Sequence, residues 1–93
     1  MGLTRRPYPR HLAEKLLKIR EGLALSQNGM LKRLGLDEDY DRATISGYER
    51  GEREPPLPIL LKYAEVANIC LDVLVDDSTE LPEKLPSKKR HTR

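Results

Sequence analysis

The 93-residue chain lacks most features by which secreted, membrane or large proteins are recognised. It has one cysteine, so no disulfide can form within the chain, and its only aromatic residues are four tyrosines. No apolar run exceeds three residues, far short of the ~18 needed to cross a membrane. The first twenty residues contain no apolar stretch, so we expect no signal peptide. These absences exclude a disulfide-stabilised secreted scaffold and a transmembrane protein, and they favour one small cytoplasmic domain.

Charge is nearly balanced in total but is unevenly distributed along the chain. The 17 basic and 15 acidic residues give a net charge of +2, yet residues 1–10 hold three arginines and no acid, and residues 78–93 carry +3. Both end segments contain prolines and few apolar residues. We therefore expect a basic N-terminal arm at 1–10, a domain at 11–77 and a flexible basic tail at 78–93. Basic tails permit nucleic-acid binding without requiring it.

Between the tails, apolar residues recur every three or four positions, which is typical of amphipathic helices. Leu12, Leu16, Ile19 and Leu23 predict the first helix, ending near Gly22. Four more short helices follow from the same spacing, with these residues inside: Met30, Leu31 and Leu34; Ile45 and Tyr48; Leu57, Leu60, Leu61, Ala64 and Ala67; Leu71, Leu74 and Val75. No segment alternates strictly between apolar and polar residues, so we expect no sheet. The sequence predicts an all-α fold, a compact bundle of five helices.

Residues at the expected helix ends agree with this reading. Ser26 and Asp41 suit N-caps, because a short oxygen-bearing side chain can accept from the free N–H groups of a first helical turn. Gly35 and Gly51 suit the left-handed position that ends many helices. Cys70 replaces a polar N-cap before the fifth helix, and we expect a buried, inert thiol there.

Two segments carry the most specific pattern, SQNGMLKRLGL at 26–36 and ATISGYERGEREP at 43–55. Together with Leu60-Leu61 and Leu71-Asp72, their order and spacing resemble the Xre family of lambda-repressor-like helix-turn-helix regulators. The resemblance covers about residues 11–75. It implies a lambda-repressor-like bundle whose third helix enters the major groove of double-stranded DNA, and the function of a sequence-specific transcriptional regulator, a repressor or autoregulator.

Candidate DNA contacts follow from the resemblance and from the helical pattern. With Ile45 and Tyr48 facing inward, four residues of the third helix are expected to face the bases: Arg42, Ala43, Thr44 and Gly47. A second set is expected to contact the DNA backbone: Ser26, Gln27, Asn28, Arg50 and Arg53. Arg42 suits a guanine edge or a phosphate, and Thr44 suits a thymine methyl group. The arginines of the second set can instead pair with neighbouring glutamates at the surface.

An acidic loop at residues 37–41 departs from the family pattern, in which a tight turn joins the second and third helices. Asp37, Glu38, Asp39 and Asp41 place four carboxylates beside the helix expected to approach DNA. Three explanations remain open: a charge filter against non-specific DNA, a loop that binds a protein partner, or a tolerated surface insertion. The three aspartates fit the start of a calcium loop, but the required glycine and glutamate are Arg42 and Tyr48. We expect no metal and no cofactor.

A rival function is a protein-interaction module that keeps the helix-turn-helix fold, such as an antitoxin that binds a partner protein. The acidic loop, Gly47 and the small net charge favour this alternative. Since one recognition helix reads only a few base pairs, a DNA-binding role also predicts a weak homodimer, formed by the fourth and fifth helices or by the tails. The two histidines, His11 and His91, are far from Cys70 in sequence, and no catalytic motif appears, so we expect no enzyme.

Overall fold

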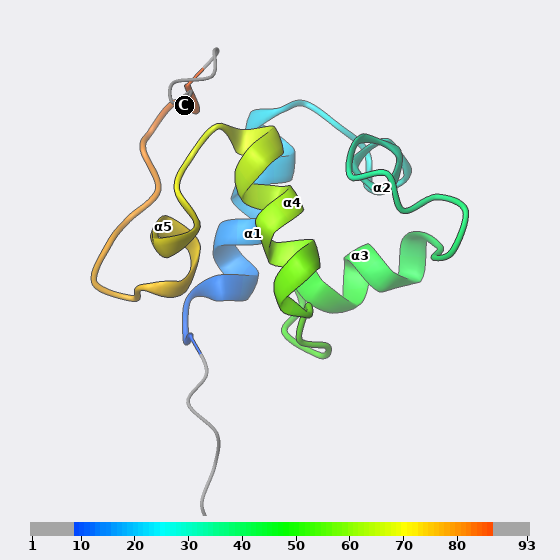
Figure 1. Ribbon diagram of the computed structural model, residues 1–93, viewed down its shortest axis with the longest axis horizontal. Coiled ribbons are helices and arrows are strands. Elements are labelled where there is room, and N and C mark those ends of the chain that lie inside the picture. The colour runs from blue at the N-terminus through cyan, green and yellow to red at the C-terminus, as the bar shows by residue number, and fades with distance from the viewer. Residues whose placement is uncertain (1–8, 87–93) are drawn as a thin grey trace, which may run out of the picture.

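The computed structural model describes residues 9–86, and this part of the chain forms five α-helices and no strand. The helices are α1 (Leu12–Gly22), α2 (Gln27–Arg33), α3 (Arg42–Glu49), α4 (Leu57–Ala67) and α5 (Leu71–Val75). Figure 1 shows α1 and α4 in the middle of the molecule, with α2 and α3 at one end and α5 at the other. The predicted all-α class and the five helices are confirmed. Most of the expected arm, residues 1–8, lies outside the described residues.

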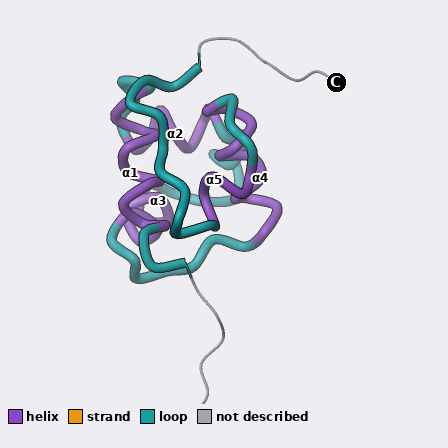
Figure 2. The backbone as a smooth tube through the Cα atoms, turned by 90° about the vertical axis from the view of Figure 1, so that its left-hand side faces the viewer, coloured by secondary structure: helices purple, strands orange, loops and turns teal. Residues whose placement is uncertain are grey.

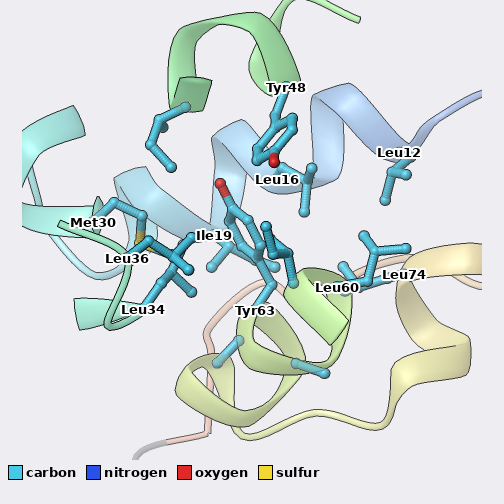
Figure 3. Packing of buried hydrophobic residues seen from close by; sticks show 14 of the residues in the cluster. Leu12, Leu16, Ile19, Met30, Leu34, Leu36, Tyr48, Leu60, Tyr63 and Leu74 are labelled. Carbon is cyan, nitrogen blue, oxygen red and sulfur yellow. The ribbon is translucent and has the colours of Figure 1, made fainter. Parts of the chain in front are cut away.

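The hydrophobic core forms around α1, which contacts α3, α4 and α5. Leu12, Leu16 and Ile19 of this helix are at most 1% exposed, as the sequence pattern predicted. Figure 3 shows Tyr48 from α3 and Tyr63 from α4 directed toward the same space beside these α1 side chains. A helix of two or three turns is only marginally stable alone, so this shared core holds α3 in place.

The buried face of α4 agrees with the expected one at Leu60, Ala64 and Ala67 and differs at Leu57 and Leu61. Leu57 and Leu61 are 63% and 47% exposed, and the buried residues are Ile59, Leu60, Tyr63, Ala64 and Ala67. Because α4 is apolar on more than one side, the spacing of its apolar residues does not decide which side faces inward. Cys70 also differs, since it precedes α5 at the surface with an exposed side chain.

The expected residues stand at the helix ends. The hydroxyl of Ser26 accepts a hydrogen bond from the Gly29 N–H at 2.9 Å, which makes Ser26 the N-cap of α2. Asp41 occupies the N-cap position of α3, although its carboxylate makes no capping bond. Gly35 and Gly51 have φ angles of +75° and +74°, the left-handed conformation that favours glycine. These turns fix where α2 and α3 end.

Residues 79–86 continue across the bundle, where we expected a flexible tail from residue 78. The ammonium group of Lys15, on α1, donates to the carbonyls of Val73 (2.7 Å), Asp76 (3.1 Å) and Thr79 (2.7 Å). Leu81 and Leu85 pack against the core, and Figure 2 shows this segment running along the helices. A buried lysine satisfied by the carbonyls that end α5 therefore ties the segment to α1. Residues 87–93 lie outside the described part of the chain.

The start of α1 is also held by a residue just after α5. The carboxylate of Asp77 accepts the backbone N–H groups of Arg10 at 2.9 Å and His11 at 3.1 Å. These two hydrogen bonds favour the ionised form and lower the pKa of Asp77 below its ordinary value. The residues just before α1 are thus joined to the turn that follows α5.

Candidate nucleic-acid interface

Helix α3 is anchored on one side and exposed on another. Ile45 and Tyr48 are 0% and 4% exposed and face the core, as expected. Burial raises the pKa of the Tyr48 phenol above its ordinary value. Arg42 and Ala43, in the first turn of the helix, are exposed. The helix therefore offers its N-terminal turn to a partner while its inner side fixes its position.

A hydrogen-bonded network centred on Glu49 connects the first three helices. The carboxylate of Glu49, at the end of α3, accepts from Arg20 Nε at 2.7 Å and Nη2 at 3.0 Å. The same carboxylate accepts from the Gln27 side chain at 3.1 Å, and Arg20 also donates to the Leu25 carbonyl at 3.0 Å. The hydrogen bond to Glu49 raises the pKa of the Arg20 guanidinium. This network ties the end of α3 to α1 and to the start of α2.

The network gives the Gln27 side chain a partner within the protein, whereas we expected this side chain to contact the DNA backbone. In this structure its side chain bonds to Glu49 across the gap between α2 and α3. The sequence did not predict the Arg20–Glu49 pair, because 29 residues separate the two side chains, and Glu49 was expected only as a possible surface partner of Arg50 or Arg53. The only sequence signal was the place of Glu49 inside the family-like segment.

Two expected base-reading residues are not exposed, and the expectation that they face outward is wrong. Thr44 is 5% exposed, and Gly47 is also buried. Gly47 is covered by the turn after α3, in which the N–H groups of Glu52 and Arg53 donate to the Gly47 carbonyl at 2.9 and 3.2 Å. This turn lays the side chain of Arg53 over Gly47. A Cβ atom built on Gly47 would lie 2.9 Å from Arg53 Cδ and 3.0 Å from Cγ.

A shallow recess, here called the loop recess, lies between the acidic loop and α3. It is lined by Glu38, Asp39, Tyr40, Asp41, Thr44 and Arg53. All four carboxylates of the acidic loop are on exposed residues. Within residues 9–86, no group of three or more His, Cys, Asp or Glu side chains is placed to hold a metal ion.

Comparison with protein families gives one match. The HTH_3 model, described as a helix-turn-helix, covers residues 16–74, from the middle of α1 to α5. The chain belongs to this helix-turn-helix family. The match includes α2, α3 and the turn between them, and it is of the Xre type. A search of curated proteins finds no match.

The helix-turn-helix region has an unusual charge balance for a surface expected to approach DNA. Residues 26–54 contain five basic and seven acidic residues. Arg50 pairs with Glu52 at 3.0 Å, and both side chains are more than half exposed. Arg42 and Arg53, by contrast, make no ion pair or hydrogen bond through their side chains with the rest of residues 9–86. These two guanidinium groups have donors available for a ligand.

The remaining backbone candidates are accessible. Ser26 and Asn28 are exposed at the start of α2, and Gln27 is half-buried. None of the helices between residues 9 and 86 is long and apolar enough to span a bilayer.

Proposed function

We propose that this helix-turn-helix protein is a sequence-specific transcriptional regulator, a repressor or autoregulator, that reads the major groove of DNA with α3. The family is typical of DNA-binding proteins, which supports the proposal. The observation that carries it is the position of α3, held by Ile45 and Tyr48 while Arg42 and Ala43 are exposed. A recognition helix needs a fixed inner side and an accessible first turn.

Direct base reading is assigned to the first turn of α3. The unbonded guanidinium of Arg42 suits the O6 and N7 acceptors of guanine, and the methyl group of Ala43 suits a thymine methyl. Thr44 and Gly47 are buried, so they can contact bases only if the Arg53 side chain moves away from this face of α3. Phosphate contacts are assigned to Ser26, Gln27, Asn28 and Arg50, whose side chains surround the start of α2 and the end of α3.

A weak homodimer is part of this proposal. The two exposed leucines of α4, Leu57 and Leu61, are one turn apart, and Val75 at the end of α5 is 36% exposed. Exposed apolar side chains on these two helices suit contact with a second copy of the chain. One short helix contacts only a few base pairs. Two copies bound to two half-sites double that number and so raise the specificity.

A protein partner is the second candidate, and the exposed acidic loop is the observation that favours it. Neutralising the loop with Asp37→Asn, Glu38→Gln and Asp39→Asn separates the two roles. If the loop acts as a charge filter, the variant binds every duplex more tightly, most of all at low salt, where charges are least screened. If the loop holds a basic protein partner, the variant loses that partner while its DNA affinity is kept or raised.

Selection of bound duplexes from a random pool tests the main proposal. An enriched motif and an affinity that falls as salt rises are expected. Arg42→Ala should lose discrimination at one base pair, with about 1–3 kcal/mol less preference there. Arg50→Ala, the matched control, should weaken all duplexes about equally and lower the salt slope by about one. If no motif is enriched and salt has no effect, the proposal is wrong.

A further inference from the structure

The place where residue 47 would present a side chain on α3 is occupied by another residue. Gly47 has no Cβ, and the Cγ, Cδ and Nε atoms of Arg53 lie 3.0, 2.9 and 3.3 Å from where that atom would be. A distance under about 3 Å is not tolerated between such atoms, so any side chain at 47 would displace Arg53. The Arg53 side chain can therefore take its observed position only because residue 47 is a glycine.

The Arg53 side chain lies on the side of α3 that carries Thr44 and Gly47. These two residues are three positions apart in the helix, so they share a face. Arg53 and Thr44 both line the loop recess. The arginine thus reaches from the turn after α3 back along the helix, and its aliphatic part passes over Gly47.

The chemistry around Arg53 favours an uncharged partner over a phosphate. Its side chain is exposed and has no hydrogen bond or ion pair with the rest of residues 9–86. Carboxylates of Glu38, Asp39 and Asp41 line the same recess. A phosphate beside the guanidinium would meet these negative charges, whereas the edge of a base presents only neutral acceptors. Arg50 does not line this recess, and its guanidinium is already paired with the Glu52 carboxylate at 3.0 Å.

We propose that Arg53 is a specificity-determining residue that reads a guanine in the major groove. Gly47, which lacks a side chain, leaves the space on α3 that the Arg53 side chain needs. This inference rests on the proposed DNA-binding function and replaces the backbone role expected for Arg53. The guanidinium fork matches guanine O6 and N7, and the absence of a side chain at Gly47 lets Arg53 pass over this face of α3. Arg53, which follows α3, would then make the base contact that Gly47 cannot make because it has no side chain.

The test begins with the motif that the wild-type protein selects from random duplexes. Binding to this duplex and to each of its single-base-pair variants is then measured for the wild type, Arg53→Ala, Gly47→Ala and the double variant. Arg53→Ala should lose discrimination at one G·C pair, about 5- to 150-fold, the range that corresponds to the loss of one bidentate contact. Arg50→Ala is the matched control and should weaken all duplexes about equally.

Gly47→Ala should weaken preference at the same G·C pair although Arg53 is still present, because the added methyl group forces the Arg53 side chain to shift. The double variant should then match Arg53→Ala, since both substitutions act on one contact. Alanine is the better helix former by about 1 kcal/mol, so loss of the fold does not explain this result, and circular dichroism checks it.

Two results overturn the inference in different ways. If Arg53→Ala weakens every duplex equally, Arg53 contacts the backbone, the assignment is wrong, and the proposed DNA-binding function still stands. If the wild-type protein enriches no motif, the proposed function fails and the assignment fails with it.

Discussion

Glu49→Gln removes the negative charge that the Arg20 guanidinium faces at the junction of α1, α2 and α3. The glutamate side chain is 4% exposed and the arginine side chain 18%, with a shortest contact of 2.7 Å. Glutamine has nearly the same shape, but its NH2 group replaces one carboxylate oxygen. It then faces an N–H donor of Arg20 or Gln27 and cannot accept a hydrogen bond from it. The arginine is then left largely buried without a counter-charge.

The expected loss follows from that burial. Removing one partner of a buried ion pair costs about 3–5 kcal/mol of unfolding free energy. Arg20 is partly solvated and keeps its bond to the Leu25 carbonyl, so we expect the lower end, about 3 kcal/mol. At about 4–8 °C per kcal/mol for a domain of this size, the melting temperature should fall by about 12–24 °C.

Urea unfolding followed by circular dichroism at the helix band measures this loss. Glu52→Gln is the matched control, because its pair with Arg50 also spans 3.0 Å but is 59–64% exposed. An exposed pair is worth less than about 1 kcal/mol. Equal, small losses in both variants would refute the reasoning that Glu49 holds the helix-turn-helix together.

The remaining predictions concern three other buried or bonded groups. Tyr63→Phe should leave stability unchanged or raise it by about 1 kcal/mol, because the buried Tyr63 hydroxyl has no hydrogen-bond partner among residues 9–86; a clear loss in urea unfolding would contradict this. Lys15→Met should cost about 2–3 kcal/mol and expose residues 79–86 to proteolysis, since three charged hydrogen bonds are lost; unchanged stability and cleavage would contradict it. Asp77→Asn should lower the free energy of unfolding at neutral pH. This loss relative to wild type should shrink as the pH falls from 3.8, the ordinary aspartate pKa, through the lower pKa that Asp77 has in the folded protein. Urea titrations across this range check the last prediction, and a difference that grows in acid would refute it.

Local chemistry made most of the fold predictable from the sequence. Ser26, Gly35 and Gly51 mark helix ends through bonds or dihedral angles formed within a few residues, so their roles are confirmed. The face of α4 was not predictable, because apolar residues cover more than one side of it. Leu57 and Leu61 are as hydrophobic as the residues that are buried.

The candidate site was predictable only in outline. Helical periodicity correctly directs Ile45 and Tyr48 inward, but it places Gly47 on the open side. A turn that folds back from residue 53 covers that side, and periodicity within α3 holds no information about it. The network around Glu49 was missed for a similar reason, since its partner Arg20 belongs to another helix.

Major-groove reading by α3 and Arg53 is tested most directly with base analogues in the selected duplex. Replacing a contacted guanine with 7-deazaguanine removes the N7 acceptor, which lies only in the major groove, whereas inosine removes only the minor-groove amino group. We expect 7-deazaguanine to weaken binding of the wild-type protein and to have no effect on the matching arginine-to-alanine variant, while inosine leaves both unchanged. Loss of affinity with inosine but not with 7-deazaguanine would contradict the account.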